Sequence, residues 1–296
     1  MKRATTLEEQ IKTLSNRGLI LDLGQVKTME ILSDIGYFRL GFYSFPFEIS
    51  YPAKNNRTHT FKEGTKISDV IKLYYLDCDL RNILSKYINR IEINFRTNVI
   101  YKASLYYLDC NTWFANPLMV ENDFLKMFNK KVYNETFKRK PIIRRHHKKY
   151  LNDKYAPAWK TVEYFTFGSI LKLFKNLKDN TLKLEIALEY DIHNVNILQN
   201  YLESLHEIRN ICAHGGVLFD HTLAKALVNG PALTISNSNK NKIYATIQIT
   251  LFVLSKISKN RSTDMENEIH AIFALHKDNP VLRNIIEKIS GYNFIY

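Results

Sequence analysis

The sequence predicts an all-α protein. Apolar residues recur at steps of three and four over long stretches, which is the spacing of the buried face of a helix. Runs that alternate between apolar and polar residues, the signal of a half-buried strand, are scarce. With 296 residues, 45% of them hydrophobic, the chain is long enough for one large domain or for two that share a core.

The N-terminal part is predicted to hold two short helices. The run Thr5–Glu9 offers hydroxyl caps followed by acidic residues, which is typical of a helix start, and Gly18 can end this first helix. A second helix is expected over residues 23–34. Because residues 51–64 are polar and rich in turn formers, we expect an N-terminal helical segment over residues 1–60.

The main body is predicted over residues 61–262. Its longest helix runs from about 68 to 108, and a break is possible around residues 75–79. A further helix is expected over 162–174, in which Gly168-Ser169 marks a cap or a tight packing point rather than a phosphate loop.

Two more helices and a C-terminal extension complete the prediction. Helices are expected over 194–213 and 243–258, and a loop is expected over 231–241. Residues 263–296 form a C-terminal helical extension, whose last helix covers about 280–289 because proline suits the first helical turn.

The charge balance favours an anionic partner. The net charge is +13 and the isoelectric point is about 9.4, which suits RNA, DNA or a membrane surface. A merely soluble basic protein is the alternative. The sequence contains no stretch of 18 apolar residues, so no membrane-spanning helix is expected. The first ten residues lack the apolar core of a signal peptide. We therefore expect a cytoplasmic protein without a membrane partner.

Cysteine and histidine usage predicts no metal site. Cys78, Cys110 and Cys212 are widely scattered and form no CxxC pair, and the histidines form no HxxxH or HExxH pattern. His146 and His147 are adjacent but lie inside a basic run, where a cation would be repelled. We expect no metal and no other cofactor.

That basic run is a candidate RNA-binding segment. No acidic residue occurs from Thr136 to Asn152, and Pro141 disfavours one unbroken helix through the run. The candidate RNA-binding residues are Lys138, Arg139, Lys140, Arg144, Arg145, His146, His147, Lys148 and Lys149. Such a run would bind phosphates with little sequence preference and strong salt dependence. It is equally interpretable as a solvated loop.

The run Glu207–Gly216 contains the most informative motif, an Arg-x4-His pattern. Arg209, Asn210 and His214 are the candidate catalytic residues. A His can take the proton from a ribose 2′-hydroxyl, an Arg can stabilise charge that builds on the phosphate, and an Asn is a neutral hydrogen-bonding partner. The structural alternative is that Arg and His simply favour the C-terminal end of the helix dipole, with Gly215 as a left-handed cap.

Helix geometry separates two of these residues. At about 100° per residue, Asn210 and His214 share a face, whereas Arg209 and His214 lie about 140° apart and roughly 7.5 Å apart along the axis. Unless the long Arg side chain curls round the helix end, one helix cannot bring both to one phosphate. Two facing copies of the helix, in a dimer or pseudo-dimer, would solve this, so we expect a homodimer.

The chain resembles the Abi-like proteins of bacterial abortive-infection systems, the AbiD/AbiF group of the HEPN superfamily. The resemblance covers most of the chain and depends on a set of short motifs that occur in this order. They are Gly36–Leu40 with Pro46-Phe47, Asp79-Leu80-Arg81 with Ile91–Arg96, Pro157-Ala158-Trp159, Glu163–Ser169 and Leu205–His214.

The resemblance implies a HEPN-like helical bundle and a metal-independent endoribonuclease that acts in phage defence. Arg209 and His214 would be its catalytic pair, Asn210 its adjacent polar residue, and the active site would be composite. A toxin-like role restrained by a small regulatory RNA is also implied. Because some HEPN domains only bind RNA, a non-catalytic RNA-binding module of a defence or toxin-antitoxin complex is the alternative. A protein-interaction or membrane-surface role is a third one.

Overall fold

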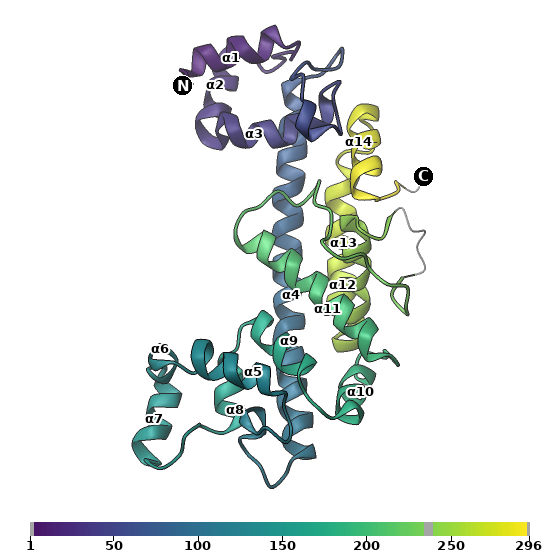
Figure 1. Ribbon diagram of the computed structural model, residues 1–296. Coiled ribbons are helices and arrows are strands. Elements are labelled where there is room, and N and C mark those ends of the chain that lie inside the picture. Colours follow the sequence, from purple (N-terminus) through teal and green to yellow (C-terminus); the bar gives the residue numbers. More distant parts are fainter. Residues whose placement is uncertain (1–2, 234–238, 295–296) are drawn as a thin grey trace. The chain divides into compact units, whose positions relative to one another are not determined.

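The computed structural model describes residues 3–233 and 239–294, and these residues form an all-α structure (Figure 1). In this described part of the chain, fourteen α-helices, α1 to α14, are joined by turns and by short 3-10 and π-helical segments. Within the described residues no strand forms, and only isolated β-bridges occur. The predicted fold class is therefore confirmed. Part of the loop expected over 231–241 lies outside the described residues.

The chain forms two compact units. The first comprises residues 1–83, 215–221 and 268–296, and the second comprises residues 84–214 and 222–267. These units divide both α4 and α13 internally, so they do not follow the boundaries expected at residues 60 and 262. Those boundaries stay a prediction about domain organisation, because they were drawn from composition and not from contacts.

The first unit begins with three packed helices, α1 (Leu7–Asn16), α2 (Gln25–Ile35) and α3 (Tyr37–Ser44), and later includes α14 (Pro280–Ser290). Thr6 and Glu9 form a capping box at the start of α1, as the hydroxyl-then-acid pattern predicts. Proline occupies the first turn of α14, and Gly291 ends this helix in the left-handed conformation.

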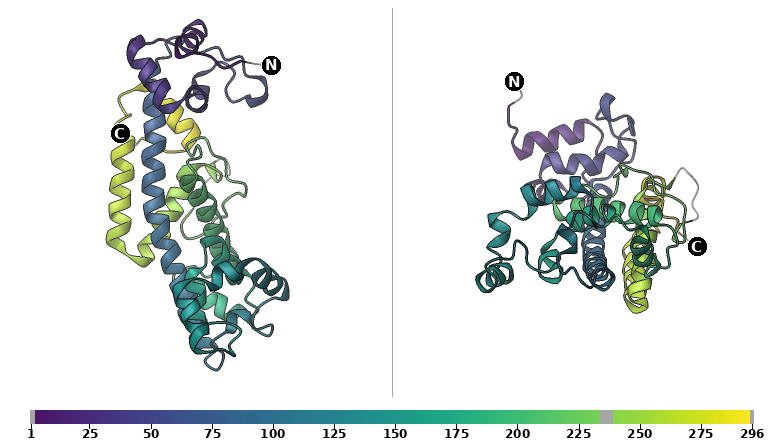
Figure 2. Two further views of the ribbon diagram at one scale, coloured as in Figure 1. Left: turned by 90° about the vertical axis from the view of Figure 1, so that its left-hand side faces the viewer. Right: turned by 60° about the horizontal axis from the view of Figure 1, so that its bottom comes forward.

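Helix α4 (Ile67–Tyr106) is continuous, so the break considered at residues 75–79 does not occur (Figure 2). Asp77 lies in that stretch and is fully buried, which an isolated carboxylate would not tolerate. Its carboxylate accepts hydrogen bonds from the Tyr43 hydroxyl at 2.6 Å and from the backbone N–H groups of Leu218 and Phe219. These tertiary partners allow a polar residue inside the buried stripe without ending the helix.

The core of the second unit consists of the later part of α4 with α9 (Phe167–Lys175), α10 (Asn180–Leu188), α11 (Val195–Ala213) and α12 (Ile243–Ile257). Helix α11 packs against α9, α10 and α12. Its bounds agree with the predicted helix over 194–213, and Asn194 caps its start.

One predicted helix is wrong in its extent. The stretch 162–174 is a 3-10 turn (Val162–Tyr164) followed by α9, because Thr166 adopts an extended conformation and caps α9 with its side chain. Helix α13 (Lys259–Ala274) was not identified from the sequence. Its first half is polar, and its buried residues are only Met265, Ile269 and Phe273 at four-residue spacing.

A layer of short helices carries the basic segment of the second unit. It comprises α5 (Asn122–Met127), a π-helical turn (Phe128–Val132), α6 (Glu135–Lys138), α7 (Pro141–Lys149) and α8 (Ala158–Thr161). Aromatic rings pack with one another beneath them, namely Phe114, Phe124, Phe128, Tyr133, Phe137, Tyr155 and Phe165. This aromatic cluster anchors short helices that would not be stable alone.

Candidate functional site

The Arg-x4-His motif lies at the C-terminal end of α11. His214 is the C-cap residue, and its backbone N–H donates to the carbonyl of Asn210 at 3.1 Å. Gly215 follows with a φ of 64°, the left-handed conformation that glycine adopts without strain. The predicted role of Gly215 as the residue that ends the helix is therefore confirmed.

Arg209 is held by a buried carboxylate on α4. Its Nη2 atom lies 3.3 Å from Oε2 of Glu92, whose other oxygen accepts from Arg96 at 2.9 Å. Glu92 is only 5% exposed, whereas the Arg209 side chain is 33% exposed. Glu92 and Arg96 pair at the i,i+4 spacing of one helix, and both side chains are largely buried. Glu92 thus faces two guanidinium groups, while the exposed Glu163 also lies 3.8 Å from Arg96, so Arg209 shares its buried counter-ion with a neighbour.

Asn210 connects Arg209 to His206. Nη1 of Arg209 donates to Oδ1 of Asn210 at 3.1 Å, and Nδ2 of Asn210 lies 3.1 Å from Nε2 of His206. Because a guanidinium only donates, the amide oxygen must face Arg209 and the amide nitrogen must face His206. Nε2 of His206 is therefore an acceptor, and the imidazole is neutral. In agreement, burial lowers the pKa of His206, and the nearby charge of Arg209 lowers it further.

The start of α9 packs against the His206 ring. The Phe167 ring meets the imidazole edge-to-face at 5.7 Å between centroids. A Cβ atom built on Gly168 would lie 2.9 Å from Nε2 of His206, closer than real side chains allow. Gly168 is thus the tight packing point that the sequence indicated, while the cap of α9 is Thr166.

His214 is placed differently from Arg209. It is exposed, and among the described residues its side chain makes no hydrogen bond, ion pair or ring contact. The structure therefore joins the side chains of Arg209 and Asn210 through a hydrogen bond, whereas the His214 side chain is bonded to neither. The separation of about 140° leads one to expect this of Arg209. Asn210 and His214, which share a face by spacing, are connected through the backbone.

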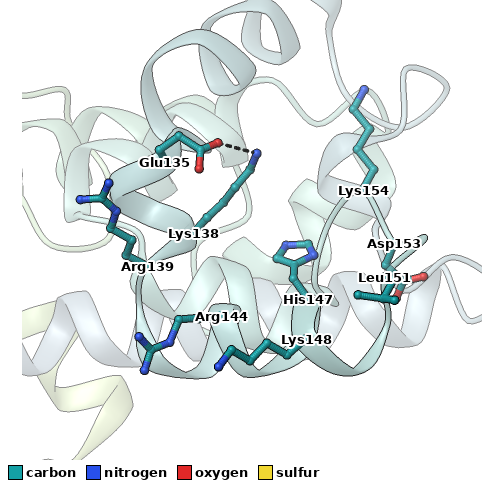
Figure 3. A pocket seen from close by; sticks show the side chains of 9 residues that line it. All are labelled: Glu135, Lys138, Arg139, Arg144, His147, Lys148, Leu151, Asp153 and Lys154. Atoms are coloured by element: carbon teal, nitrogen blue, oxygen red, sulfur yellow. Dashed lines mark hydrogen bonds and ion pairs between the residues drawn. The ribbon is translucent and has the colours of Figure 1, made fainter.

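The basic segment forms two helices with a turn between them. Helix α6 ends at Lys138, and Pro141 begins α7, as expected for a proline that interrupts a helix. A pocket of about 610 Å³ lies against α6, α7 and the loop that follows (Figure 3). Its lining residues are Glu135, Lys138, Arg139, Arg144, His147, Lys148, Leu151, Asp153 and Lys154.

The candidate RNA-binding residues are distributed unevenly around this pocket. Arg145 and Lys149 are exposed on α7 but do not line the pocket, and the ammonium of Lys140 lies over the Tyr164 ring. His146 departs from the expected surface position. It is 5% exposed, and its Nε2 lies 3.0 Å from the Asp153 carboxylate, so it anchors α7 instead of facing solvent.

The sequence matches the family of Abi-like proteins over residues 30–220, which is well over half of the chain. This chain belongs to the Abi-like protein family. The family name refers to abortive infection, the defence of bacteria against phage. The matched region of this Abi-like protein includes both the basic segment and the complete Arg-x4-His motif. No curated protein and no solved structure matched the chain.

Neither a cluster of metal-ligating side chains nor a membrane-spanning helix occurs among the described residues. Among them, His, Cys, Asp and Glu side chains form no group of three or more that could hold a metal ion. In the same part of this Abi-like protein, none of the helices has the length and apolar character needed to cross a membrane.

Sequence reasoning missed two partners of the motif, His206 and Glu92. His206 lies four residues before Asn210, the spacing at which helix side chains meet, so that contact could have been found from the sequence. The contact between Glu92 and Arg209 joins residues of different helices, and no local pattern indicates it.

Proposed function

We propose that this Abi-like protein is a metal-independent endoribonuclease of the HEPN type that acts in abortive infection. The observation that carries the proposal is the state of Arg209, which is oriented by a buried carboxylate and yet remains one third exposed. An oriented, partly exposed guanidinium next to the helix end suits a phosphate whose negative charge increases during the reaction. The all-helical second unit is compatible with a HEPN-like bundle.

The chemistry requires one proton acceptor and one proton donor. His214, as general base, would take the proton of a ribose 2′-hydroxyl while its oxygen attacks the phosphorus, or as general acid it would protonate the leaving 5′-oxygen. Arg209 would stabilise the pentacoordinate phosphate, and Asn210 would keep Arg209 oriented. The products would carry a 2′,3′-cyclic phosphate or a 3′-phosphate.

The proposal includes a second copy of the chain. Ideal helix geometry separates Arg209 and His214 by about 140° around α11, and the exposed His214 side chain has no bonding partner among the described residues. A homodimer related by a two-fold axis would let Arg209 of one copy and His214 of the other act on one phosphate. A toxin-like role with restraint by a small RNA is part of the proposal and is supported by the family resemblance.

The test is incubation of purified protein with mixed cellular RNA in EDTA. Wild-type protein is expected to cut RNA, and His214→Ala is expected to reduce cutting by at least 100-fold, on the order of the contribution of a general acid or base. His193→Ala is the matched control, because His193 is also exposed and lies before the start of α11. Equal activity of the His214→Ala protein would refute the proposed role.

A non-catalytic RNA-binding module is the second candidate function, and the basic pocket at α6 and α7 favours it. This function predicts RNA affinity that falls steeply with salt, without cleavage. The test is to remove the RNA that copurifies with the protein and then to add RNA back. RNA that binds again and stays intact would favour this candidate over the nuclease.

A further inference from the structure

The pocket against α6 and α7 combines a concave shape with unbalanced positive charge (Figure 3). Its volume of about 610 Å³ lies within the range of roughly 300–1,000 Å³ that is usual for small-ligand sites. Its basic side chains come from three places: Lys138 and Arg139 at the end of α6, Arg144 and Lys148 on α7, and Lys154 in the loop after it.

The two acidic side chains of the pocket already have partners. Glu135 pairs with Lys138 at 3.0 Å, and Asp153 accepts from the buried His146 at 3.0 Å. Among the described residues, no acidic partner is found for the other four basic residues of the pocket, which are Arg139, Arg144, Lys148 and Lys154. Like charges gathered around one hollow repel one another, so an anion bound there would stabilise the arrangement.

We propose that this pocket binds the polyphosphate group of a 5′-phosphorylated nucleotide or RNA end. The five basic and two acidic side chains that line the pocket leave a net charge of +3. A terminal phosphate carries a charge of about −1.5 to −2 at neutral pH, so a single phosphate would not balance this excess, whereas two or three linked phosphates would. Arginine binds phosphate oxygens with two parallel hydrogen bonds, and Arg139 and Arg144 supply two such groups. Leu151, 85% exposed at the pocket, offers apolar surface to the rest of the ligand.

The pocket is held in shape by buried contacts below it. Ile143 and His146 place one face of α7 in the core, which leaves Arg144 and Lys148 on another face. The Tyr133 hydroxyl accepts from the backbone N–H of Ala156 at 3.0 Å and lies 2.8 Å from Nε2 of His147. The Tyr133 proton is then free to be donated to His147, whose imidazole accepts it in the neutral state.

The titration of His147 agrees with this arrangement. Burial lowers the pKa of His147, and the neighbouring His146 and Lys138 lower it further, while Asp153 opposes them. A bound polyphosphate would add negative charge beside the imidazole and raise the pKa of His147. This change gives the binding experiment a spectroscopic readout inside the pocket.

The test uses the full-length protein in EDTA, with inorganic tripolyphosphate and ATP as probes in titration calorimetry. The pocket variant is Arg144→Glu with Lys148→Glu. The matched control is Arg145→Glu with Lys149→Glu, which makes the same charge change on the same helix outside the pocket. We expect wild type and control to bind tripolyphosphate, the pocket variant to bind it at least tenfold more weakly, and the NMR-measured pKa of His147 to rise on binding.

Two RNA arms distinguish the source of the polyphosphate. The His214→Ala protein, used so that RNA stays intact, is titrated with one oligonucleotide bearing either a 5′-triphosphate or a 5′-hydroxyl. Tighter binding of the triphosphate form than of ATP would assign the pocket to RNA ends, and the reverse would assign it to free nucleotides.

Three results would overturn the proposal. The first is that the wild-type protein does not bind tripolyphosphate, and the second is that both double variants bind it equally more weakly than wild type. The third is that the 5′-triphosphate and 5′-hydroxyl oligonucleotides bind equally and tripolyphosphate displaces neither. Either of the last two results would show that anions bind to a diffuse basic surface and not specifically in the pocket. Because binding is measured without cleavage, the proposal can fail or hold independently of the nuclease activity.

Discussion

The carboxylate of Glu92 lies between two guanidinium groups, those of Arg96 and Arg209, and joins α4 to the catalytic candidate on α11. The distances are 2.9 Å to Arg96 and 3.3 Å to Arg209. Glu92 is buried, so its charge is tolerated only because both arginines face it. The orientation of Arg209 thus depends on a residue more than a hundred positions earlier in the chain.

Replacement of Glu92 by Gln is expected to destabilise the protein by about 3 kcal/mol, since it leaves two guanidinium groups without their buried counter-ion. Urea unfolding measures the change. Glu163→Gln is the control, because Glu163 is exposed and lies 3.8 Å from Arg96, so its loss should cost less than about 1 kcal/mol. Similar losses for the two variants would show that Glu92 is not a buried anchor.

Gly168→Ala is expected to destabilise the protein by about 1–2 kcal/mol, because its Cβ would collide with the His206 ring and displace it from Asn210. Gly41→Ala, also in a helix but with open space around the added atom, should be neutral or stabilise by up to about 1 kcal/mol. Thermal unfolding compares them. In a His206→Ala background the cost of Gly168→Ala should vanish, and a cost that persists there would disprove the proposed collision.

The neutral state of His206 predicts an acid-side loss of stability. The pKa of His206 is lowered in the folded protein from its ordinary value of 6.5, first by burial and then by Arg209. As the pH falls below about 6.5, the unfolded chain takes up a proton that the folded protein does not, so the free energy of unfolding decreases until the lowered pKa is reached. Above that window His206 adds no pH dependence.

His206→Gln removes this titrating group and keeps an acceptor for Asn210. The free energy of unfolding, measured by urea titration at pH 7 and at pH 5.5, should therefore fall less in the variant than in the wild type. His276 and His147, whose pKa values are also lowered by burial, remain in both proteins. They contribute equally to the slope of the free energy of unfolding against pH in the variant and in the wild type. An identical slope in both proteins would mean that the pKa of His206 is the same in the folded and unfolded states, and would contradict the lowered pKa.

The proposed composite site predicts complementation between two inactive variants. Arg209→Ala and His214→Ala should each fail to cut RNA when alone. If one copy supplies Arg209 and the other supplies His214, an equal mixture should regain about a quarter of wild-type activity, since half of the dimers are mixed and each has one complete site. Activity is measured after refolding or coexpression to allow exchange. A mixture as inactive as its components would place both residues of a site in one copy.

The sequence by itself determined the all-helical class, the bounds of α11 and the position of its end. These features are local: apolar spacing sets the buried face, Asn194 caps the start, and Gly215 adopts the left-handed conformation that ends the helix. The interruption between α6 and α7 is equally local, because Pro141 cannot continue a helix from before it.

Only the tertiary structure decided how the polar residues are used. Asp77 interrupts an apolar pattern, but buried donors from distant segments let α4 continue through it. His146 is one of nine candidate RNA-binding residues, yet packing against Tyr150 and Asp153 takes it out of solvent. Arg209 is matched to Glu92 by the packing of two helices. The spacing of residues along one helix determines which side chains share a face of that helix. Which residue packs against that face depends on contacts between residues far apart in the sequence.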